Sequence, residues 1–478
     1  MSNSVLKIQK NQIEKEHAKI FENLDLCTTH KIIQGDSRKM KKIKKEPKSI
    51  SIGGGGFSHL DKIDWNFTNA KTSYLTHKLH PYPARFIPQI VNSFIKNLAR
   101  KNDIVLDPFC GSGTTIVESF MHGHDSVGND LNPLSLLQTK VKTSYISRTK
   151  FSRSLESFTN FKTKITDRTI HDEFGSLPKR KLSSLLTNEN MVDILTIREF
   201  IKCQNDPISS LYNLGLSAVL WNMFDSRKSP NIRESFVKKL ISMHNEILRM
   251  NSEIDSKPKV ILLNKNMADL EIEKASIDII ITSPPYVNAL DYHRCHMYNM
   301  HFLGYDFQSL RKLEIGSHSK FVHNRFRLLS EYAGDMFKFM YKVNHALKNN
   351  RYCVVVLGTS TIEFEKIEAY RLFEKFAHMC GFDHKRTYFR NMLSTKKYTN
   401  SKIANITDEQ IVVLQKTSNA GYSLGRIHDC VDLYMHDFLE QIKKNPGSSV
   451  RHKKPTEARL RENQNRVAEA IKNIRFDI

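Results

Sequence analysis

Residues 276–286 read SIDIIITSPPY, a buried strand that runs into a turn unable to extend it. The run from Ile277 to Ile281 is rich in β-branched residues, which is typical of a short strand covered on both faces of a sheet. Pro284 and Pro285 have no backbone N–H to donate to a neighbouring strand, so the strand ends before them. The stretch therefore predicts an α/β sheet with a rigid turn at the carboxyl end of one central strand.

That turn presents three chemical groups: the Ser283 hydroxyl, the Pro284 carbonyl and the Tyr286 ring. Ligands bind at the carboxyl ends of the strands in open α/β sheets, so these groups are candidates for a site. By itself, however, a Pro-Pro pair after a strand indicates no more than the end of that strand. A second stretch of the sequence decides between the two interpretations.

Residues 103–115 read DIVLDPFCGSGTT and have a similar organisation. The apolar residues predict another buried strand, which leads through an acid into a glycine-bearing turn and then into a helix from Thr114 to Met121. Gly111 and Gly113 let the backbone approach a ligand closely, and the amino terminus of the helix favours a carboxylate or a phosphate. The third glycine of the dinucleotide fingerprint is missing, so this turn alone identifies no ligand.

Together, DPFCGSGTT and TSPPY resemble the cofactor-binding and catalytic motifs of the methyltransferases that modify amino groups of DNA bases, and SPPY resembles the cytosine-N4 branch. Residues 76–88, THKLHPYPARFIP, are similar to the motif before the glycine loop in these enzymes. The resemblance covers residues 57–143 and 260–416. It implies a Rossmann-like, mostly parallel seven-stranded sheet with a closing antiparallel hairpin, and S-adenosylmethionine as the cofactor.

The resemblance also implies where that cofactor binds. We expect the methionine end of the cofactor to lie near Pro81, Tyr82 and Arg85. Asp130 stands at the position where an acidic residue accepts hydrogen bonds from the ribose hydroxyls. Asp269 is expected to accept a hydrogen bond from the adenine amino group. Without the resemblance, these residues would indicate only a helix start and turns. The full set of expected cofactor-binding residues is Pro81, Tyr82, Arg85, Asp107, Phe109, Gly111, Ser112, Gly113, Thr114, Thr115, Asp130, Asn132 and Asp269.

The catalytic residues implied by the resemblance are Ser283, Pro284, Pro285 and Tyr286. The amine of cytosine is a weak nucleophile, because its lone pair is delocalised into the ring, so a site for it should supply acceptors for both N–H groups. The Ser283 hydroxyl oxygen and the Pro284 carbonyl are those acceptors by resemblance. Tyr286 would stack on the base after it has left the duplex.

Three alternatives to cytosine-N4 methylation of double-stranded DNA remain open: adenine-N6 methylation, methylation of an RNA base, and a DNA-binding protein with an inactive catalytic fold. Methylation of cytosine at carbon 5 needs a cysteine nucleophile, typically after a proline, and the chain has no Pro-Cys pair. The resemblance further implies the modification enzyme of a restriction-modification system, with a cognate endonuclease acting separately.

Composition favours a polyanionic partner. The chain has 478 residues, enough for two or three domains, and its 73 Lys+Arg against 50 Asp+Glu give a net charge of +23. Such a surplus favours binding to DNA, whose neutralised phosphates release counterions. Solubility alone rarely needs so large a charge.

Other features of the sequence bear on the cellular setting. No run approaches the roughly 18 apolar residues of a membrane span, and we expect no signal peptide. The seven cysteines form no CxxC pair, which favours reduced thiols. His293, Cys295 and His296 match no closed zinc pattern, so we expect no metal and favour a segment that lines the base pocket. These features predict a cytoplasmic bacterial or archaeal protein, a monomer or a weak dimer, away from membranes.

The order of the segments predicts five parts. Residues 1–56 form a basic, flexible arm that either contacts DNA or is a solvated tail. Residues 57–146 and 259–418 are the two parts of the methyltransferase core. Residues 147–258 are a helical insertion, too long for a loop, which either recognises the target sequence or braces the sheet. Residues 419–478 are a helical, basic tail.

Hydrophobic periodicity predicts the remaining elements of the core. The predicted strands are 126–130, 259–263 and 352–358, with a closing antiparallel pair at 382–389 and 411–415, and the predicted helices are 328–348 and 366–380.

Overall fold

The computed structural model describes residues 56–174, 185–317, 319–391, 408–444 and 456–475. The predicted basic arm lies outside these residues, apart from its last glycine. Within them, no helix has both the length and the hydropathy that crossing a membrane requires.

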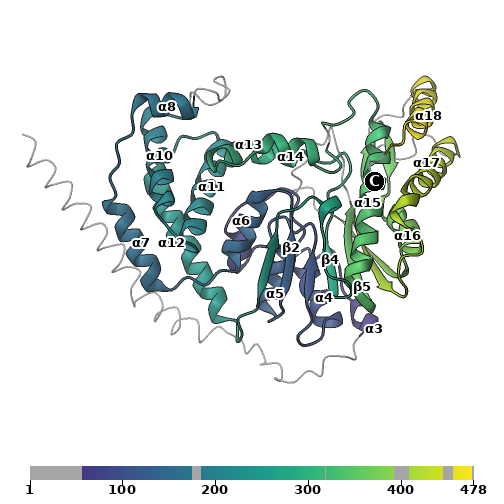
Figure 1. The fold of residues 1–478 in the computed structure, drawn as a ribbon, viewed down its shortest axis with the longest axis horizontal. Helices are drawn as coiled ribbons and strands as arrows, with labels where there is room; N and C mark the ends of the chain where they lie inside the picture. Colours follow the sequence, from purple (N-terminus) through teal and green to yellow (C-terminus); the bar gives the residue numbers. More distant parts are fainter. Residues whose placement is uncertain (1–55, 175–184, 318, 392–407, 445–455, 476–478) are drawn as a thin grey trace, which may run out of the picture. The chain divides into compact units, whose positions relative to one another are not determined.

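A seven-stranded sheet forms the centre of the fold (Figure 1). Across the sheet, the strands are β3 (Val260–Leu263), β2 (Ser126–Asn129), β1 (Val105–Asp107), β4 (Ile277–Thr282), β5 (Leu347–Gly358), β9 (Asp408–Lys416) and β8 (Phe382–Asn391). The first five are parallel, and β9 is antiparallel to both of its neighbours. The predicted Rossmann-like sheet with a closing antiparallel hairpin is therefore confirmed.

Parallel pairing aligns the ends of the motif-bearing strands. Asp107 at the end of β1 is paired with Gly128 of β2, and Leu106 is paired with Ile280 of β4. The strand order reverses at β1, since β2 lies on one side of it and β4 on the other. Such a reversal is the place where open α/β sheets bind ligands.

Alternate residues of the central strands face two helix layers. The layers are α3 (Gly56–Leu60) and α4 (Pro88–Leu98) on one face, and α15 (Arg325–Ala346) and α16 (Ala369–Met379) on the other. On β4, Ile279 and Ile281 join the core formed with α4, whereas Ile280 joins the core formed with α15. Every residue of β4 is buried, so the prediction of a strand covered on both faces is confirmed.

The chain between β2 and β3 is largely helical, as predicted. Its helices are α6 (Pro133–Lys142), α7 (Arg148–Asn160), α8 (Asp167–Phe174), α10 (Asn188–Lys202), α11 (Ile208–Ser226) and α12 (Ile232–Ser252). They share a hydrophobic core of their own, in which Leu211, Leu214 and Leu220 of α11 are fully buried. Helix α13 (Tyr292–Phe302) also contributes Phe302 to this core.

The segment after β5 differs from the prediction. A hairpin of β6 (Ser360–Ile362) and β7 (Glu365–Ile367) precedes α16, so this helix begins at Ala369 instead of 366. Its two turn residues, Glu363 and Phe364, have φ values of 48° and 73°. Turns with positive φ at both positions suit tight hairpins but usually contain glycine or asparagine, so the sequence carried no signal for this one.

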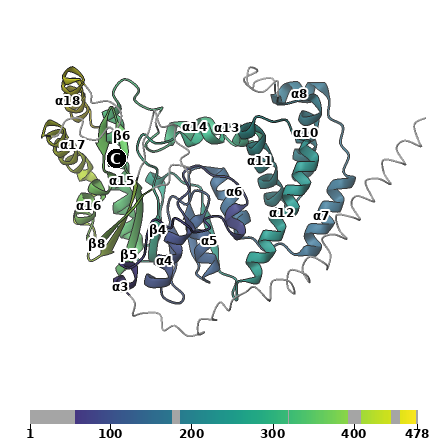
Figure 2. The same cartoon turned by 180° about the vertical axis from the view of Figure 1, so that it is seen from behind.

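Within the predicted C-terminal tail, helices α17 (Ile427–Lys444) and α18 (Glu457–Lys472) contribute to the main core. Val431 and Met435 of α17 and Val467 of α18 are fully buried in the core that contains α15. Figure 2 shows both helices beside α15 and α16. Among the basic residues of this tail, Arg451, Lys453 and Lys454 lie outside the described residues, and Arg459 is paired with Glu363 and Glu462.

Candidate active site

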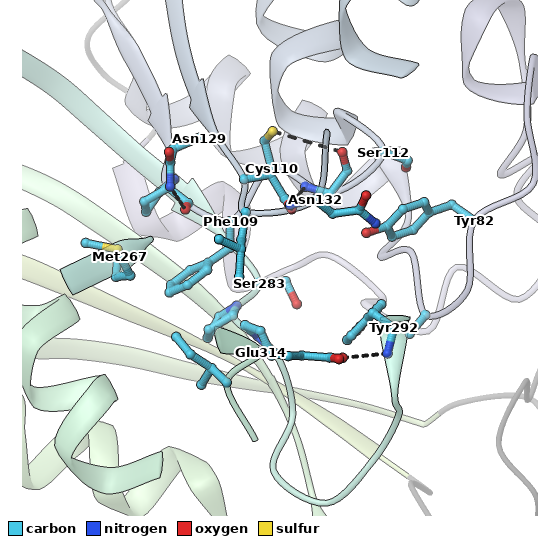
Figure 3. Close-up of a pocket in the computed structure, with 18 of the residues that line it drawn as sticks. Tyr82, Phe109, Cys110, Ser112, Asn129, Asn132, Met267, Ser283, Tyr292 and Glu314 are labelled. Carbon is cyan, nitrogen blue, oxygen red and sulfur yellow. Dashed lines mark hydrogen bonds between the residues drawn. The ribbon is translucent and has the colours of Figure 1, made fainter. Parts of the chain in front are cut away.

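A pocket lies at the carboxyl ends of β1, β2 and β4 (Figure 3). Its walls come from the glycine loop, the segment before α4, the residues after β2 and β3, the SPPY turn, and α14 (Phe307–Leu313) with the residues that follow it. Figure 3 shows Ser283 between the glycine loop and the segment that carries Tyr292 and Glu314. The two motifs, far apart in sequence, therefore line one cavity.

The predicted site residues divide into two groups. Those lining the pocket are Tyr82, Arg85, Phe109, Gly111, Ser112, Thr114, Asp130, Asn132, Ser283, Pro284, Pro285 and Tyr286. Those outside its lining are Pro81, Asp107, Gly113, Thr115 and Asp269.

The glycine loop is held by close packing against α6. Gly113 has a φ of 82°, and a Cβ atom there would lie 2.4 Å from Oγ1 of Thr139. Gly111 has a φ of 48°, and a Cβ atom there would make an ordinary contact with Tyr82, at 3.4 Å. Gly113 thus allows the glycine loop to pack closely against Thr139 of α6. The sequence had predicted that this glycine allows the close approach of a ligand.

Asp130 joins the end of β2 to the glycine loop while lining the pocket. Its carboxylate accepts hydrogen bonds from the backbone N–H groups of Gly111 and Asn132, each at 2.8 Å. Burial, with a smaller contribution from the charge of Glu314, raises the pKa of Asp130 to about 6, although these hydrogen bonds act to lower it.

Asp107 and Thr115 connect the two motifs behind the pocket. Asp107 accepts a hydrogen bond from the Thr282 hydroxyl at 2.6 Å and one from the Phe109 N–H at 3.2 Å. The Thr115 hydroxyl donates to the carbonyl of Ile281 at 3.0 Å. Burial raises the pKa of Asp107 to about 7. Both residues therefore hold the end of β4 next to the glycine loop.

Pro81 and Arg85 hold the segment before α4 in place. His80 Nδ1 lies 2.5 Å from the Pro81 carbonyl, and its Nε2 lies 2.9 Å from the Ser217 hydroxyl of α11. Arg85 donates to the carbonyl of His77 and, at 2.9 Å, to the hydroxyl of Ser73. The segment is thereby tied to the helical insertion.

Asp269 is exposed at the end of the short 3-10 helix Met267–Asp269 and is not among the residues that line the pocket. Asn266 and Met267 line the pocket instead. The Asn266 side chain accepts a hydrogen bond from the N–H of Ala268 at 3.2 Å and so begins this helical turn. The turn carries Asp269 outward, which the spacing of the sequence motif did not indicate.

Glu314 is a pocket residue that sequence reasoning missed. Its carboxylate accepts from the N–H groups of Tyr292 at 2.5 Å and His293 at 3.3 Å, and lies 2.5 Å from His293 Nδ1. It thus caps the amino terminus of α13, where the side chain of Asp291 makes no capping bond. His293 pairs with this carboxylate, and no group of His, Cys, Asp or Glu able to hold a metal occurs in the described chain.

The SPPY turn is held by a hydrogen-bonded tyrosine. The Ser283 hydroxyl lies 3.4 Å from the Tyr286 hydroxyl, which donates to Glu409 at 3.0 Å. Burial, and secondarily the charge of Glu409, raise the pKa of Tyr286 well above its usual value. Tyr286 therefore keeps its proton at neutral pH.

Two atoms at the pocket wall have no hydrogen-bond partner within the described residues: Oγ of Ser112 and Nδ2 of Asn132. Buried polar atoms are normally paired, so both indicate a polar ligand. The carboxylates of Asp130 and Glu314 favour positive charge, and Phe109 and Met267 offer apolar surface. The pocket suits a cation that combines an apolar ring with polar ends.

Two family models match the chain. The model described as D12 class N6 adenine-specific DNA methyltransferase matches residues 84–349. The model described as DNA methylase matches residues 4–139.

The chain is also similar to curated proteins. Type II methyltransferase M.MvaI of Kocuria varians is 30% identical in an alignment of length 257 that covers 46% of this chain and 55% of that protein. Type II methyltransferase M.BsoBI of Geobacillus stearothermophilus is 24% identical in an alignment of length 328 that covers 59% of this chain and 64% of that protein. The matches therefore span less than two thirds of these relatives.

Among solved structures, an S-adenosylmethionine-dependent methyltransferase from Methanosarcina mazei has 10% identity and a TM-score of 0.27, with 68% of this chain and 97% of that chain covered.

Proposed function

The chain belongs to the family of D12 class N6 adenine-specific DNA methyltransferases, and from this premise we propose that it transfers a methyl group from S-adenosylmethionine to a base amino group of double-stranded DNA. We further propose that this amino group is N4 of cytosine, which departs from the adenine in the description of the family. The observation that carries the proposal is the position of Ser283. A serine, rather than an aspartate or asparagine, lies at the end of β4 and lines the same pocket as the glycine loop.

S-adenosylmethionine is the cofactor, and the pocket fits it. Asp130 and Glu314 suit its positive charge, Ser112 and Asn132 offer polar atoms, and Phe109 offers an apolar surface for a ring. When bound, the cofactor supplies an electrophilic methyl group on a sulfonium.

The SPPY turn provides acceptors for an amino group. The nitrogen must become pyramidal to attack a methyl group, and positive charge develops on it during transfer. The Ser283 hydroxyl oxygen and the Pro284 carbonyl both belong to the pocket lining and would accept its two N–H groups. No strong base is required, because the methylated nitrogen is acidic and loses its proton afterwards.

The base must leave the duplex to reach this turn. The Tyr286 ring lines the pocket and would stack on the extruded base, which compensates for the stacking lost in the duplex. The net charge of +23 favours the binding of the phosphates that surround the target.

Adenine N6 is the second candidate target, because the matching family model is described as adenine-specific. Adenine-directed relatives often carry aspartate or asparagine where this chain has Ser283, and this difference favours cytosine. Both relatives reported above are named Type II methyltransferases, which supports a role as the modification enzyme of a restriction-modification system. A cognate endonuclease would then act separately.

Transfer of labelled methyl groups tests the proposal. Purified protein would be incubated with labelled S-adenosylmethionine and either unmethylated bacterial genomic DNA or total RNA, and cofactor affinity would be measured by calorimetry. We expect micromolar affinity and label in DNA only. Label in RNA only, or cofactor binding without any transfer, would contradict the proposed activity.

A further inference from the structure

A chain of hydrogen bonds leads from Ser283 away from the pocket. The Ser283 hydroxyl lies 3.4 Å from the Tyr286 hydroxyl, which donates to Oε1 of Glu409 at 3.0 Å. Oε2 of Glu409 accepts from the guanidinium of Arg390. The exposed fractions of Tyr286 and Glu409 are only 9% and 5%, so this series of hydrogen bonds runs through the protein interior.

Glu409 and its neighbours form one row across the closing hairpin. In the sheet register, Gly358 of β5 is paired with Glu409 of β9, and Arg390 of β8 is paired with Glu409 from the other side. Arg390 is itself held by donating to the carbonyl of Trp65 at 3.2 Å. Backbone pairing therefore sets the position of the Glu409 carboxylate.

Gly358 sets the position of the Tyr286 ring. A Cβ atom at Gly358 would lie 2.4 Å from Cε2 and 2.5 Å from Cδ2 of this ring. The backbone of β5 therefore lies directly against one edge of the tyrosine. The same strand pair thus fixes both the ring and the acceptor of its hydroxyl.

The ion pair between Glu409 and Arg390 determines which group donates and which accepts in each of these hydrogen bonds. Glu409 pairs with Arg390, and an ionised carboxylate can only accept hydrogen bonds. Tyr286 has a single hydroxyl proton, which it donates to Glu409, so its oxygen can only accept from Ser283. The Ser283 hydroxyl must then donate to Tyr286, and its remaining lone pairs are left for another donor.

We propose that Glu409, acting through Tyr286, orients the Ser283 hydroxyl so that Oγ accepts a hydrogen bond from the target amino group. Glu409 is then a positioning residue, and Tyr286 has a second role besides stacking. The inference rests on the proposed function and deepens it, because a serine can donate or accept and this network makes it an acceptor. The contact of 3.4 Å is long for two hydroxyls, and the inference requires this distance to shorten when the target binds.

Two variants isolate the network with little change in volume. Tyr286→Phe keeps the stacking ring but removes the hydroxyl, and Glu409→Gln keeps the shape but removes the carboxylate. We expect each to lower kcat by roughly tenfold, while KM for DNA and the Kd for S-adenosylmethionine change by less than about twofold. Glu273→Gln, at an exposed glutamate, is the matched control.

The double variant Tyr286→Phe/Glu409→Gln provides the decisive comparison. If Glu409 acts only through the tyrosine hydroxyl, the double variant has the kcat of Tyr286→Phe alone, because coupled residues are not additive. Likewise, Tyr286→Phe should have little effect in a Ser283→Ala background, which tests the network without changing Glu409. A merely structural role of Glu409 would give additive losses.

Additive losses in the double variant, or an unchanged kcat in Tyr286→Phe, would overturn the inference. A failure of the proposed function is distinguishable, since the wild-type protein would then bind S-adenosylmethionine and methylate no DNA before any variant is made.

Discussion

The Thr282 hydroxyl links two strands at the point where the catalytic turn begins. It donates to the carboxyl of Asp107, while the next residue, Ser283, turns into the pocket. At the scale of single residues, the buried Asp107 thus holds Thr282, and Thr282 leads into Ser283, whose chemistry depends on the orientation of its hydroxyl. Ser283 and Asp107 each lead to a prediction.

Ser283→Ala should lower kcat for methyl transfer by about a hundredfold, because one acceptor at the reacting nitrogen is lost. The Kd for S-adenosylmethionine should stay within about twofold, since the glycine loop remains intact. Single-turnover transfer and calorimetry measure the two quantities. Ser276→Ala, at the half-buried residue just before the same strand, is the control. Normal turnover in Ser283→Ala would remove this residue from the site.

Asp107→Asn should alter the pH dependence of stability. The folded protein holds the pKa of Asp107 at about 7, above the usual 3.8, so the folded state binds a proton that the unfolded chain has released. Asp107 therefore stabilises the fold fully below pH 4, and this contribution is lost as the pH rises to about 7. Asparagine does not titrate.

Denaturant unfolding of wild-type and Asp107→Asn protein at pH 5 and pH 8 measures this effect. The wild type should lose more unfolding free energy between these pH values than the variant, by on the order of 2 kcal/mol. Equal losses in both proteins would show that Asp107 does not titrate in this range.

At the scale of elements, the glycine loop connects β1 to α5 (Thr114–Met121) and packs against α6. The sequence predicted both the strand and the start of α5, because local signals such as a buried apolar run and glycines determine them. Thr139, which packs against Gly113 from α6, could not be predicted, since it lies beyond the loop and one full strand away in sequence.

Gly113→Ala should disrupt the packing of the glycine loop against Thr139 of α6. The new Cβ atom would lie 2.4 Å from Oγ1 of Thr139, and the φ of 82° is already unfavourable for alanine. Gly304→Ala is a matched control, since Gly304 has a φ of 74° and nothing within 4 Å. We expect Gly113→Ala to cost about 1–3 kcal/mol more unfolding free energy than Gly304→Ala. Equal costs in chemical denaturation would refute this packing.

Helix α13 and the residues after α14 bring Glu314 to the pocket. Sequence reasoning placed the histidines of α13 near the base pocket but could not identify Glu314, because its role depends on the path of the chain through two helices. Similarly, the β6–β7 hairpin was missed because its turn contains neither glycine nor asparagine.

Glu314→Gln should lower the affinity for the cofactor with little loss of folding stability. The amide oxygen still accepts from the N–H of Tyr292, so the cap on α13 is largely kept, whereas the negative charge at the pocket is lost. We expect the Kd for S-adenosylmethionine to rise about tenfold, and the Kd for a neutral analogue of its sulfonium to rise less. Calorimetry with both ligands decides this, and equal rises would exclude a charge effect.

At the scale of the whole molecule, the pocket lies where the described hydrophobic cores meet. Helix α13 contributes Phe302 to the core of the insertion and Tyr292 to the pocket, whereas β4 and β5 belong to the cores of the sheet. The fold class was predictable from the sequence because five strands and the closing pair have strong local signals. The division into domains stays a prediction, and so does the role of the insertion in target recognition, because recognition depends on contacts with DNA.

The product nucleoside tests the central claim most directly. Unmethylated bacterial genomic DNA would be incubated with the protein and S-adenosylmethionine, digested to nucleosides and analysed by mass spectrometry, with the Ser283→Ala variant as the control. We predict N4-methylcytosine in the wild-type reaction at least about a hundredfold above the control. N6-methyladenine in its place would contradict the assignment of cytosine to Ser283, although the fold and the cofactor would stand.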